Sequence, residues 1–538
     1  MTDRIIRRRP VARAARRLSA AIALSALVLS VCGCARTTTV PSVTTTGIEA
    51  PTATLAPVSG ELRLWVEPFA AGADPLRDGN RTHIALYRLV YNGLFRMSGD
   101  LSPEADLCDG WSVSPDGRSL LVSLDDGRFF HDGSEVDAED VVASYNAVIA
   151  AGDASPYGDD LACFSEAVAV DTMTVRFRLV RQDVFACHSL IFPILPSEVA
   201  GQAGDGSFPP GTGTYAFSSG SGDGEIRLEA RDSGEGACLI RSIRAVVLPD
   251  IRQALEALED DRIDLVDLNR DEYALYRYRQ DLAVYGYAGA DFLFFTLQAG
   301  SGKALSSADS FLFVRSLLDG IRSTAGMSEW NIVPAALPAP SWSQVLAGGA
   351  SETPPAALPS PGYQWPEGQA VTLLYPAEDP VRTQVALYAG QVLAAAGIRV
   401  VPVGADPAAF SARLSSGAFD IALCEATTWS VPDPVWLYLE SPLRSLPGAD
   451  TLPRASALAE EYGTATASLA ALAGNRPDFA DWTAFRQSLL DCASTGPYVG
   501  IGFAEQGLIA GSRIKGQFSS TRDNPYNGIR EVWVWSGS

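Results

Sequence analysis

The sequence is poor in the residues on which many enzymes depend. Among 538 residues there are only three histidines, His83, His131 and His188, and only two lysines, Lys303 and Lys515. Three scattered histidines argue against a metal site built from several imidazoles, so we expect neither a metal nor a cofactor. No Gly-x-Ser-x-Gly motif is present either, which removes the signature of one large hydrolase class. We therefore expect no catalytic residues.

Positive charge is scarce as well. The chain has 41 Lys plus Arg against 63 Asp plus Glu, a formal net charge of −22. The balance is uneven, because residues 1–33 carry seven arginines and one acid, a formal +6, and leave −28 for the remainder. A strongly acidic body repels nucleic acid and anionic surfaces, so we expect no nucleic-acid partner.

Long apolar runs are missing too. The longest, Leu18–Val31, has fourteen residues and follows the arginine-rich start, the layout of a secretory signal rather than of a membrane span. It ends in Val-Cys-Gly-Cys, which resembles the lipobox of bacterial lipoproteins, with Cys34 as the lipidated residue. Cys32 fits this pattern less well because Val31, not a small residue, precedes it. The alternatives are a plain signal peptide that leaves Cys34 as a thiol and, less favoured, a twin-arginine signal.

Residues 35–60 carry almost no charge and are rich in Thr, Pro and Ala. Such a composition cannot build a core and is typical of a flexible tether. We therefore predict a signal peptide at 1–33, and a lipid anchor and tether at 34–60. The protein is expected at the cell membrane, lipid-anchored on its outer, extracytoplasmic face.

The remaining sequence alternates between strand-like and helix-like patterns, without a repeat of 20 to 50 residues, which indicates an α/β fold. Residues 118–124 alternate like a strand. Asp137 precedes a helical stretch and is a candidate N-cap. Residues 371–401 have the pattern of a βαβ unit, and residues 407–424 that of a helix followed by a strand. The length favours more than one lobe.

One region carries a specific resemblance. It contains Val90-Tyr-Asn-Gly-Leu94, Gly110-Trp-Ser-Val-Ser-Pro-Asp-Gly117, Phe129-Phe-His-Asp-Gly133 and Asp137-Ala-Glu-Asp-Val-Val142 in that order. This resembles the signature of the family 5 extracellular solute-binding proteins of ABC transporters, which include dipeptide-, oligopeptide- and nickel-binding proteins. Shorter resemblances follow in the family's order at residues 211–215, 261–264, 314–315, 396–400 and 417–421, so that the likeness extends over about residues 60–535.

The resemblance implies a two-lobed fold like that of type II periplasmic binding proteins, with a hinge and a ligand cleft between the lobes. Lobe I would comprise residues 61–288, lobe II residues 289–502, and residues 503–538 would return to lobe I. The expected partners are a small-molecule or peptide ligand, an ABC transporter permease, and the membrane through the lipid anchor. The protein itself would be a monomer.

Six cysteines beyond the signal could form disulfides in an exported protein, with fifteen possible pairings. No Cys-x-x-Cys spacing occurs. If pairing stays within the lobes, Cys424 would bond Cys492 and the other four would keep three alternatives. Buried thiols are the other interpretation.

The resemblance also suggests ligand contacts. Trp429 matches a tryptophan near the ligand in several members, and Tyr91 and Asn92 belong to a loop that faces the cleft in some of them. Peptide-binding members often have, three residues after this tryptophan, an aspartate that pairs with the peptide amino group. Here Pro432 stands at that position and Asp433 follows, so Asp433 is the candidate for that role.

Other motifs have simpler explanations. His131-Asp132 could be half of a catalytic pair, but its setting indicates a turn. Gly300-Ser-Gly-Lys303 lacks the earlier glycine and the Ser/Thr of a phosphate loop. Trp436 and Tyr438 are expected to pack within a lobe.

These observations predict a lipid-anchored, extracytoplasmic solute-binding protein, not an enzyme, that captures a small solute, foremost a peptide, and delivers it to an ABC importer. Two alternatives stay open: a sensor or adhesion lipoprotein on the same fold without transport, and, much less favoured, a hydrolase.

Overall fold

The computed structural model describes much of the chain beyond residue 60, all of it within one unit, Pro57–Ser538. The predicted signal, the anchor Cys34 and nearly all of the tether lie outside the described residues. No helix in the described part is both long and apolar enough to cross a bilayer. The described stretches are residues 60–69, 74–99, 101–183, 185–202, 208–218, 226–231, 238–300, 302–337, 358–428, 436–440, 457–474 and 482–535.

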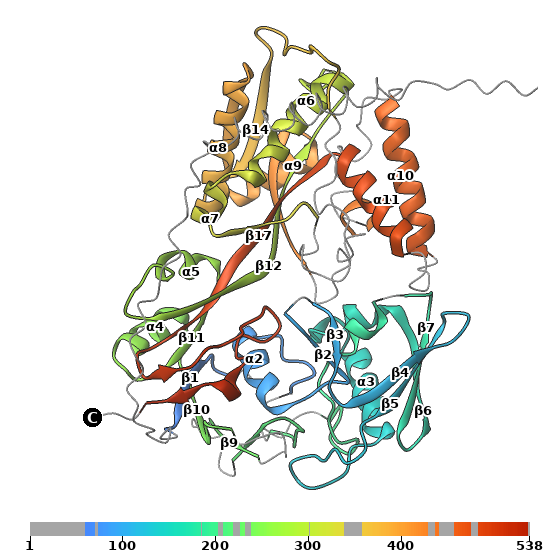
Figure 1. The fold of residues 1–538 in the computed structure, drawn as a ribbon, viewed down its shortest axis with the longest axis vertical. Helices are drawn as coiled ribbons and strands as arrows, with labels where there is room; N and C mark the ends of the chain where they lie inside the picture. The colour runs from blue at the N-terminus through green and yellow to red at the C-terminus, as the bar shows by residue number, and fades with distance from the viewer. Residues whose placement is uncertain are drawn as a thin grey trace, which may run out of the picture. The chain divides into compact units, whose positions relative to one another are not determined.

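A mixed sheet runs through the structure (Figure 1). In the described residues it has eleven strands, ten of them in one continuous order, while β13 (Ile332–Pro334) pairs with β17 off that path. The order is β15 (Arg399–Ala405), β14 (Ala370–Pro376), β16 (Ile421–Thr427), β12 (Ala283–Leu297), β17 (Tyr498–Ala510), β11 (Leu265–Leu268), β1 (Leu62–Val66), β10 (Ser242–Val247), β9 (Ile226–Ala230) and β8 (Tyr215–Phe217).

Two long strands, β12 and β17, hold the middle of this sheet. They pair antiparallel from Ala283 opposite Ala510 to Thr296 opposite Tyr498. The C-terminal part of β12 also pairs with β16 and is buried from Phe292 to Leu297, which explains its run of apolar residues. The other half of β17 pairs with β11, so these two strands connect the two halves of the sheet.

The first core contains residues from both ends of the described chain. Two apolar clusters are built from residues between 62 and 285, from the end of β17, and from the last segment, which includes Ile514, Phe518 and Val534. The elements around them include α2 (Arg81–Val90), α3 (Ala138–Ala151), α4 (Ile251–Glu259), α5 (Arg270–Tyr276), the hairpin of β2 (Phe95–Met97) and β3 (Pro103–Ala105), and the strand pair β18 (Ile514–Lys515) and β19 (Trp533–Val534).

A second, smaller sheet belongs to this first core. Its order is β4, β5, β7, β6, with bounds β4 (Cys108–Val113), β5 (Ser119–Leu124), β7 (Thr174–Leu179) and β6 (Phe164–Asp171). On β5 the alternate residues Leu120, Val122 and Leu124 are buried, as the sequence pattern predicts for a strand with one face toward a core.

The second core is built almost entirely from residues between 292 and 504. The exception is Phe185, which belongs by sequence to the first region and is buried in the second. The helices around this core include α6 (Ala308–Asp319), α7 (Gly326–Glu329), α8 (Pro380–Ala395), α9 (Pro407–Ser416), α10 (Ala457–Gly474) and α11 (Trp482–Thr495). We propose that the two cores are those of the lobes expected from the sequence, with β12 and β17 as the hinge.

Several local predictions are confirmed. Asp137 caps α3 through a capping box with Asp140. β14, α8 and β15 form the predicted βαβ unit with parallel strands. α9 and β16 form the predicted helix and strand, and Gly417 ends α9 in the left-handed conformation that glycine adopts readily.

The motifs that were interpreted as structural from the sequence have structural roles in the fold. His131 accepts a hydrogen bond at Nδ1 from the Gly211 backbone N–H, and its Nε2 bonds the carbonyl of Gly213. Asp132 accepts from the backbone of Ser134 in a turn. The Lys303 ammonium donates to two backbone carbonyls, those of Gly417 and Phe419. Tyr438 is buried in the second core, as expected.

The possible Cys424–Cys492 disulfide is not formed in this structure, which has the alternative arrangement. Both residues are free, buried thiols within the same apolar cluster. Cys424 lies on β16 and Cys492 on α11, and burial raises the pKa of each to about 12, which keeps both protonated. Membership of one lobe is therefore no sufficient basis for pairing, since a disulfide also needs close and correctly directed Cβ atoms.

Candidate functional site

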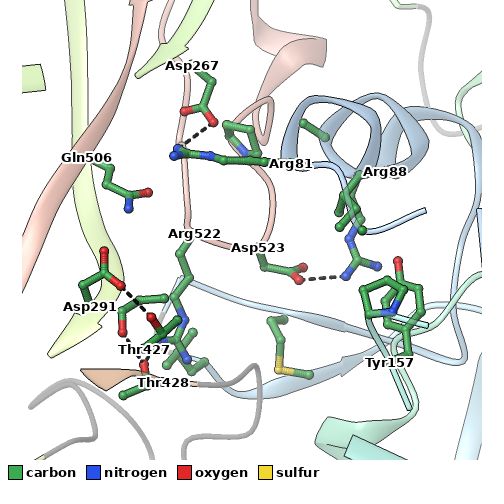
Figure 2. Close-up of a pocket in the computed structure, with 18 residues that line it drawn as sticks. Arg81, Arg88, Tyr157, Asp267, Asp291, Thr427, Thr428, Gln506, Arg522 and Asp523 are labelled. Atoms are coloured by element: carbon green, nitrogen blue, oxygen red, sulfur yellow. Dashed lines mark hydrogen bonds and ion pairs between the residues drawn. The ribbon is translucent and has the colours of Figure 1, made fainter. Parts of the chain in front are cut away.

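A cavity of about 480 Å³ lies beside β12 and β17 (Figure 2). Its walls come from α2, the loop around Leu101, the segment at Tyr157, the three strands β11, β12 and β17, the end of β16, and the C-terminal segment at residues 522–525. Elements of both cores thus contribute to one wall, since α2 and β11 belong to the first core and β16 to the second. Its charged lining residues are Arg81, Arg88, Arg522, Asp267, Asp291 and Asp523.

Two of the arginines come from one face of α2. Asn80 caps this helix, and the seven-residue spacing of Arg81 and Arg88 corresponds to two helical turns. Arg81 Nη2 lies 2.7 Å from Asp267 Oδ2, and it also donates to the Tyr287 hydroxyl at 2.9 Å. That hydroxyl donates to Asp267 at 2.6 Å, which closes a triangle. Burial works against the Arg81 charge, but Asp267 outweighs it, so the pKa of Arg81 stays above its ordinary value.

Arg88 forms the second ion pair of the cavity. Its Nη2 lies 2.8 Å from Asp523 Oδ1, and its Nη1 donates to the Ile191 carbonyl at 2.8 Å. Because Asp523 belongs to the last segment of the chain, this pair fastens the C-terminal return onto α2 at the cavity wall.

Arg522 reaches across the cavity. Its Nη1 donates to Thr428 Oγ1 at 2.9 Å, and that hydroxyl donates to the Ala290 carbonyl at 2.8 Å. Thr428 follows the last residue of β16, so a residue of the C-terminal segment contacts the end of a strand of the second core. Burial lowers the pKa of Arg522 to about 10, although Asp523 and Asp160 favour its charge, so it remains a cation at neutral pH.

The third carboxylate, Asp291, lies on β12 opposite Thr427 of β16. The Thr427 hydroxyl donates to Asp291 Oδ1 at 2.9 Å. Figure 2 shows this pair next to Thr428 and Arg522, with Gln506 on the neighbouring strand.

A side cavity of about 300 Å³ shares Leu101 and Arg522 with the main cavity. Its polar lining is mostly hydroxyl groups, those of Tyr287, Ser519, Ser520 and Thr521. Leu101 has a positive φ of 60°, and its carbonyl bonds His188 Nε2 at 3.1 Å. Burial lowers the pKa of His188 to about 4, so this imidazole is neutral and its N–H supports the strained loop between the two cavities.

Of the four predicted ligand contacts, the structure describes two. Trp429 and Asp433 lie outside the described residues, although Trp429 is next in the chain to the lining residue Thr428. Tyr91 is buried and its hydroxyl donates to the Pro209 carbonyl, while the Asn92 amide donates to Asp106. Neither Tyr91 nor Asn92 lines the cavity, and their ligand role stays a prediction.

The arginine and aspartate lining was not predicted. The one available signal was the spacing of Arg81 and Arg88 within an amphipathic helix. In the described part of the chain no three His, Cys, Asp or Glu residues are grouped to hold a metal ion.

The comparisons with known proteins agree with this architecture. Residues 102–309 match the family described as bacterial extracellular solute-binding proteins, family 5 Middle. Among similar solved structures is the ABC transporter substrate binding protein CtaP from Listeria monocytogenes, 19% identical, with a TM-score of 0.63 over 88% of this chain and 99% of that one.

Two further structures are similar at a TM-score of 0.67. HbpA2 from Haemophilus parasuis is 17% identical, and the match covers 88% of this chain and 100% of that one. MppA, a periplasmic murein tripeptide binding protein in its unliganded open form, is 14% identical, with 89% and 98% covered. At these identities the likeness establishes the fold: that of the type II periplasmic binding proteins, as predicted.

Proposed function

We propose, since residues 102–309 match the family 5 bacterial extracellular solute-binding proteins, that the protein captures a small solute, foremost a peptide, in the Arg522-lined cavity and delivers it to the permease of an ABC importer. The observation that carries the proposal is the cavity itself, because α2 and β11 of the first core and the end of β16 of the second contribute to its wall, beside the shared strands β12 and β17. Hinge closure around a ligand needs such a place.

The size and lining of the cavity support a small, polar ligand. About 480 Å³ lies within the range of small-molecule sites. Fixed ion pairs and hydroxyl groups at the wall can orient polar ends, while Ile84, Ala85, Met97 and Pro525 supply apolar area. A peptide ligand has support in the similar fold of the murein tripeptide binding protein.

The proposal includes the location of the protein in the cell. We infer lipidation at Cys34, a tether through residue 60, and a position on the outer face of the membrane, where a monomer would meet its permease. The lobe limits at residues 288 and 502 belong to the same proposal.

A thermal-shift screen of the full-length protein with short peptides, sugars and metal chelates tests the binding role. A ligand that binds only the folded state at a hundred times its Kd stabilises the protein by about 2.7 kcal/mol, so one solute class should raise Tm in a saturable way. Replacing Arg522 with Gln should reduce that shift.

Arg279→Gln is the matched control, because Arg279 pairs with Asp281 at the surface and does not line the cavity. Its ligand-induced shift should equal that of the wild type. A shift that survives in the Arg522 variant would place binding elsewhere, and the absence of any shift across the screen would argue against a binding role.

A further inference from the structure

The charges around the main cavity do not cancel pairwise. Of its three carboxylates, Asp267 is paired with Arg81 and Asp523 with Arg88. The third, Asp291, forms no ion pair with any residue that the structure describes, and its bond is the one accepted from the Thr427 hydroxyl. Asp291 is partly buried, so this carboxylate has lost part of its hydration without gaining a cation.

Two arginines bind acids on or near the neighbouring strand β16. Arg270 and Arg382 bind Asp379 and Glu425. Glu425 lies two residues before Thr427 on β16, and the charge of Asp291 is one of the causes that raise the pKa of Glu425, after burial. The two acids are thus neighbours on adjacent strands, and only Glu425 has arginine partners.

Arg522 interacts with other groups. It donates to Thr428, and the acids that act on its pKa are Asp523 and Asp160. Asp291 therefore presents negative charge to the cavity without an ion pair to any described arginine of the wall.

We infer that Asp291 accepts the ammonium group of the bound solute, and that the site selects solutes with such a group. The inference rests on the proposed function, because it places the ligand in the main cavity. A carboxylate on a central strand is a rigid acceptor, and Thr427 fixes the orientation of one of its oxygens, leaving Oδ2 for the ligand. The ammonium could be the α-amino group of a peptide or the end of a polyamine.

Two matched pairs of probes test the inference by calorimetric titration of the full-length protein. One pair is L-alanyl-L-alanine and its N-acetyl derivative, and the other is putrescine and 1,4-butanediol. The ammonium member of at least one pair should bind at least tenfold more tightly than its neutral partner. The pair that shows the difference identifies the source of the ammonium.

Variants then assign the effect to Asp291. Since a hydrogen bond to a charged group contributes about 1.5–3 kcal/mol, Asp291→Asn should weaken ammonium binding about ten- to a hundredfold, and Asp291→Glu should restore part of it. The exposed Asp171→Asn on β6 is the control and should bind like the wild type. Thermal unfolding of each variant verifies that it is folded.

Other outcomes overturn the inference in distinguishable ways. If neutral members bind as well as ammonium members, or if Asp433→Asn removes ammonium binding while Asp291→Asn does not, Asp291 lacks the role but solute binding stands. If other solutes bind in the screen and neither ammonium probe does, the inference fails alone. If no solute binds at all, the proposed function fails with it.

Discussion

Arg270 at the start of α5 donates through Nη2 to Asp379, the N-cap residue of α8, at 2.9 Å. α5 follows β11 of the first core, and α8 covers the second. Asp379 also accepts from the backbone N–H and the side chain of Arg382, so one carboxylate both caps a helix and holds two guanidinium groups. Although burial opposes it, these bonds lower the pKa of Asp379.

Replacing Arg270 with Met should lower the free energy of unfolding by about 1.5–3 kcal/mol, because Asp379 and Glu425 lose a buried charged donor. Urea unfolding at pH 7 measures the change. Arg279→Met, which removes an exposed pair, should leave stability within error. Equal losses of stability in both variants would show that the ion pair between α5 and α8 contributes no more to the free energy of unfolding than an exposed pair does.

Replacement of Arg315 of α6 should also lower the stability of the protein. It is 2% exposed and donates to the backbone carbonyls of Ala493 and Gly496 at the C-terminal end of α11. Burial lowers its pKa to about 10, so its positive charge still faces the negative end of that helix at neutral pH. Arg315→Met should cost about 2–4 kcal/mol, because two buried carbonyls lose their donor.

The exposed Arg399 at the start of β15 provides the comparison for Arg315. Arg399→Met should unfold at the wild-type urea concentration. If Arg315→Met does so as well, the guanidinium does not contribute to the end of α11.

Asp160 should make stability depend on pH. Burial, reinforced by Asp159 and opposed by Arg522, raises its pKa to about 7, above the ordinary value of 3.8. The folded state therefore binds this proton more tightly than the unfolded state, and stability falls as pH rises from about 4 to 7. Asp160→Asn should gain about 1–3 kcal/mol at pH 8 and almost nothing at pH 4. Thermal unfolding at both values checks this, and an equal gain at both would contradict the titration of Asp160.

The predicted lipid anchor has a direct test. Cys34→Ala should move the protein from the membrane fraction to the soluble fraction, because two acyl chains provide the anchoring. Cys32→Ala is the matched control and should stay with the membrane. Unchanged fractionation of the Cys34 variant would disprove lipidation there.

The parts of the fold that could be predicted depend on residues close together in the chain. The Asp137 capping box needs residues three apart, and the alternation over residues 118–124 needs one strand and one buried face. The βαβ unit could also be predicted, because its strand, helix and strand follow each other within 36 residues, from 370 to 405.

The cavity could not be predicted in this way. Arg81 and Asp267 are far apart in sequence, and nothing local distinguishes Arg522 from an ordinary surface arginine. Their meeting depends on β11 lying between β1 and β17, a pairing that the sequence pattern does not specify. Tyr91 and Asn92 show the converse, since the motif that contains them is recognisable but their side chains are used within the first core.

The C-terminal return has a consequence for the order in which the protein can fold. The first core is completed by the end of β17 and by Ile514, Phe518 and Val534, all of which are synthesised after the residues of the second core. Residues 297–498, by contrast, begin and end at paired positions of β12 and β17. A nascent chain can therefore assemble much of the second core while the first still lacks its final strands, so the region translated first is among the last to become stable.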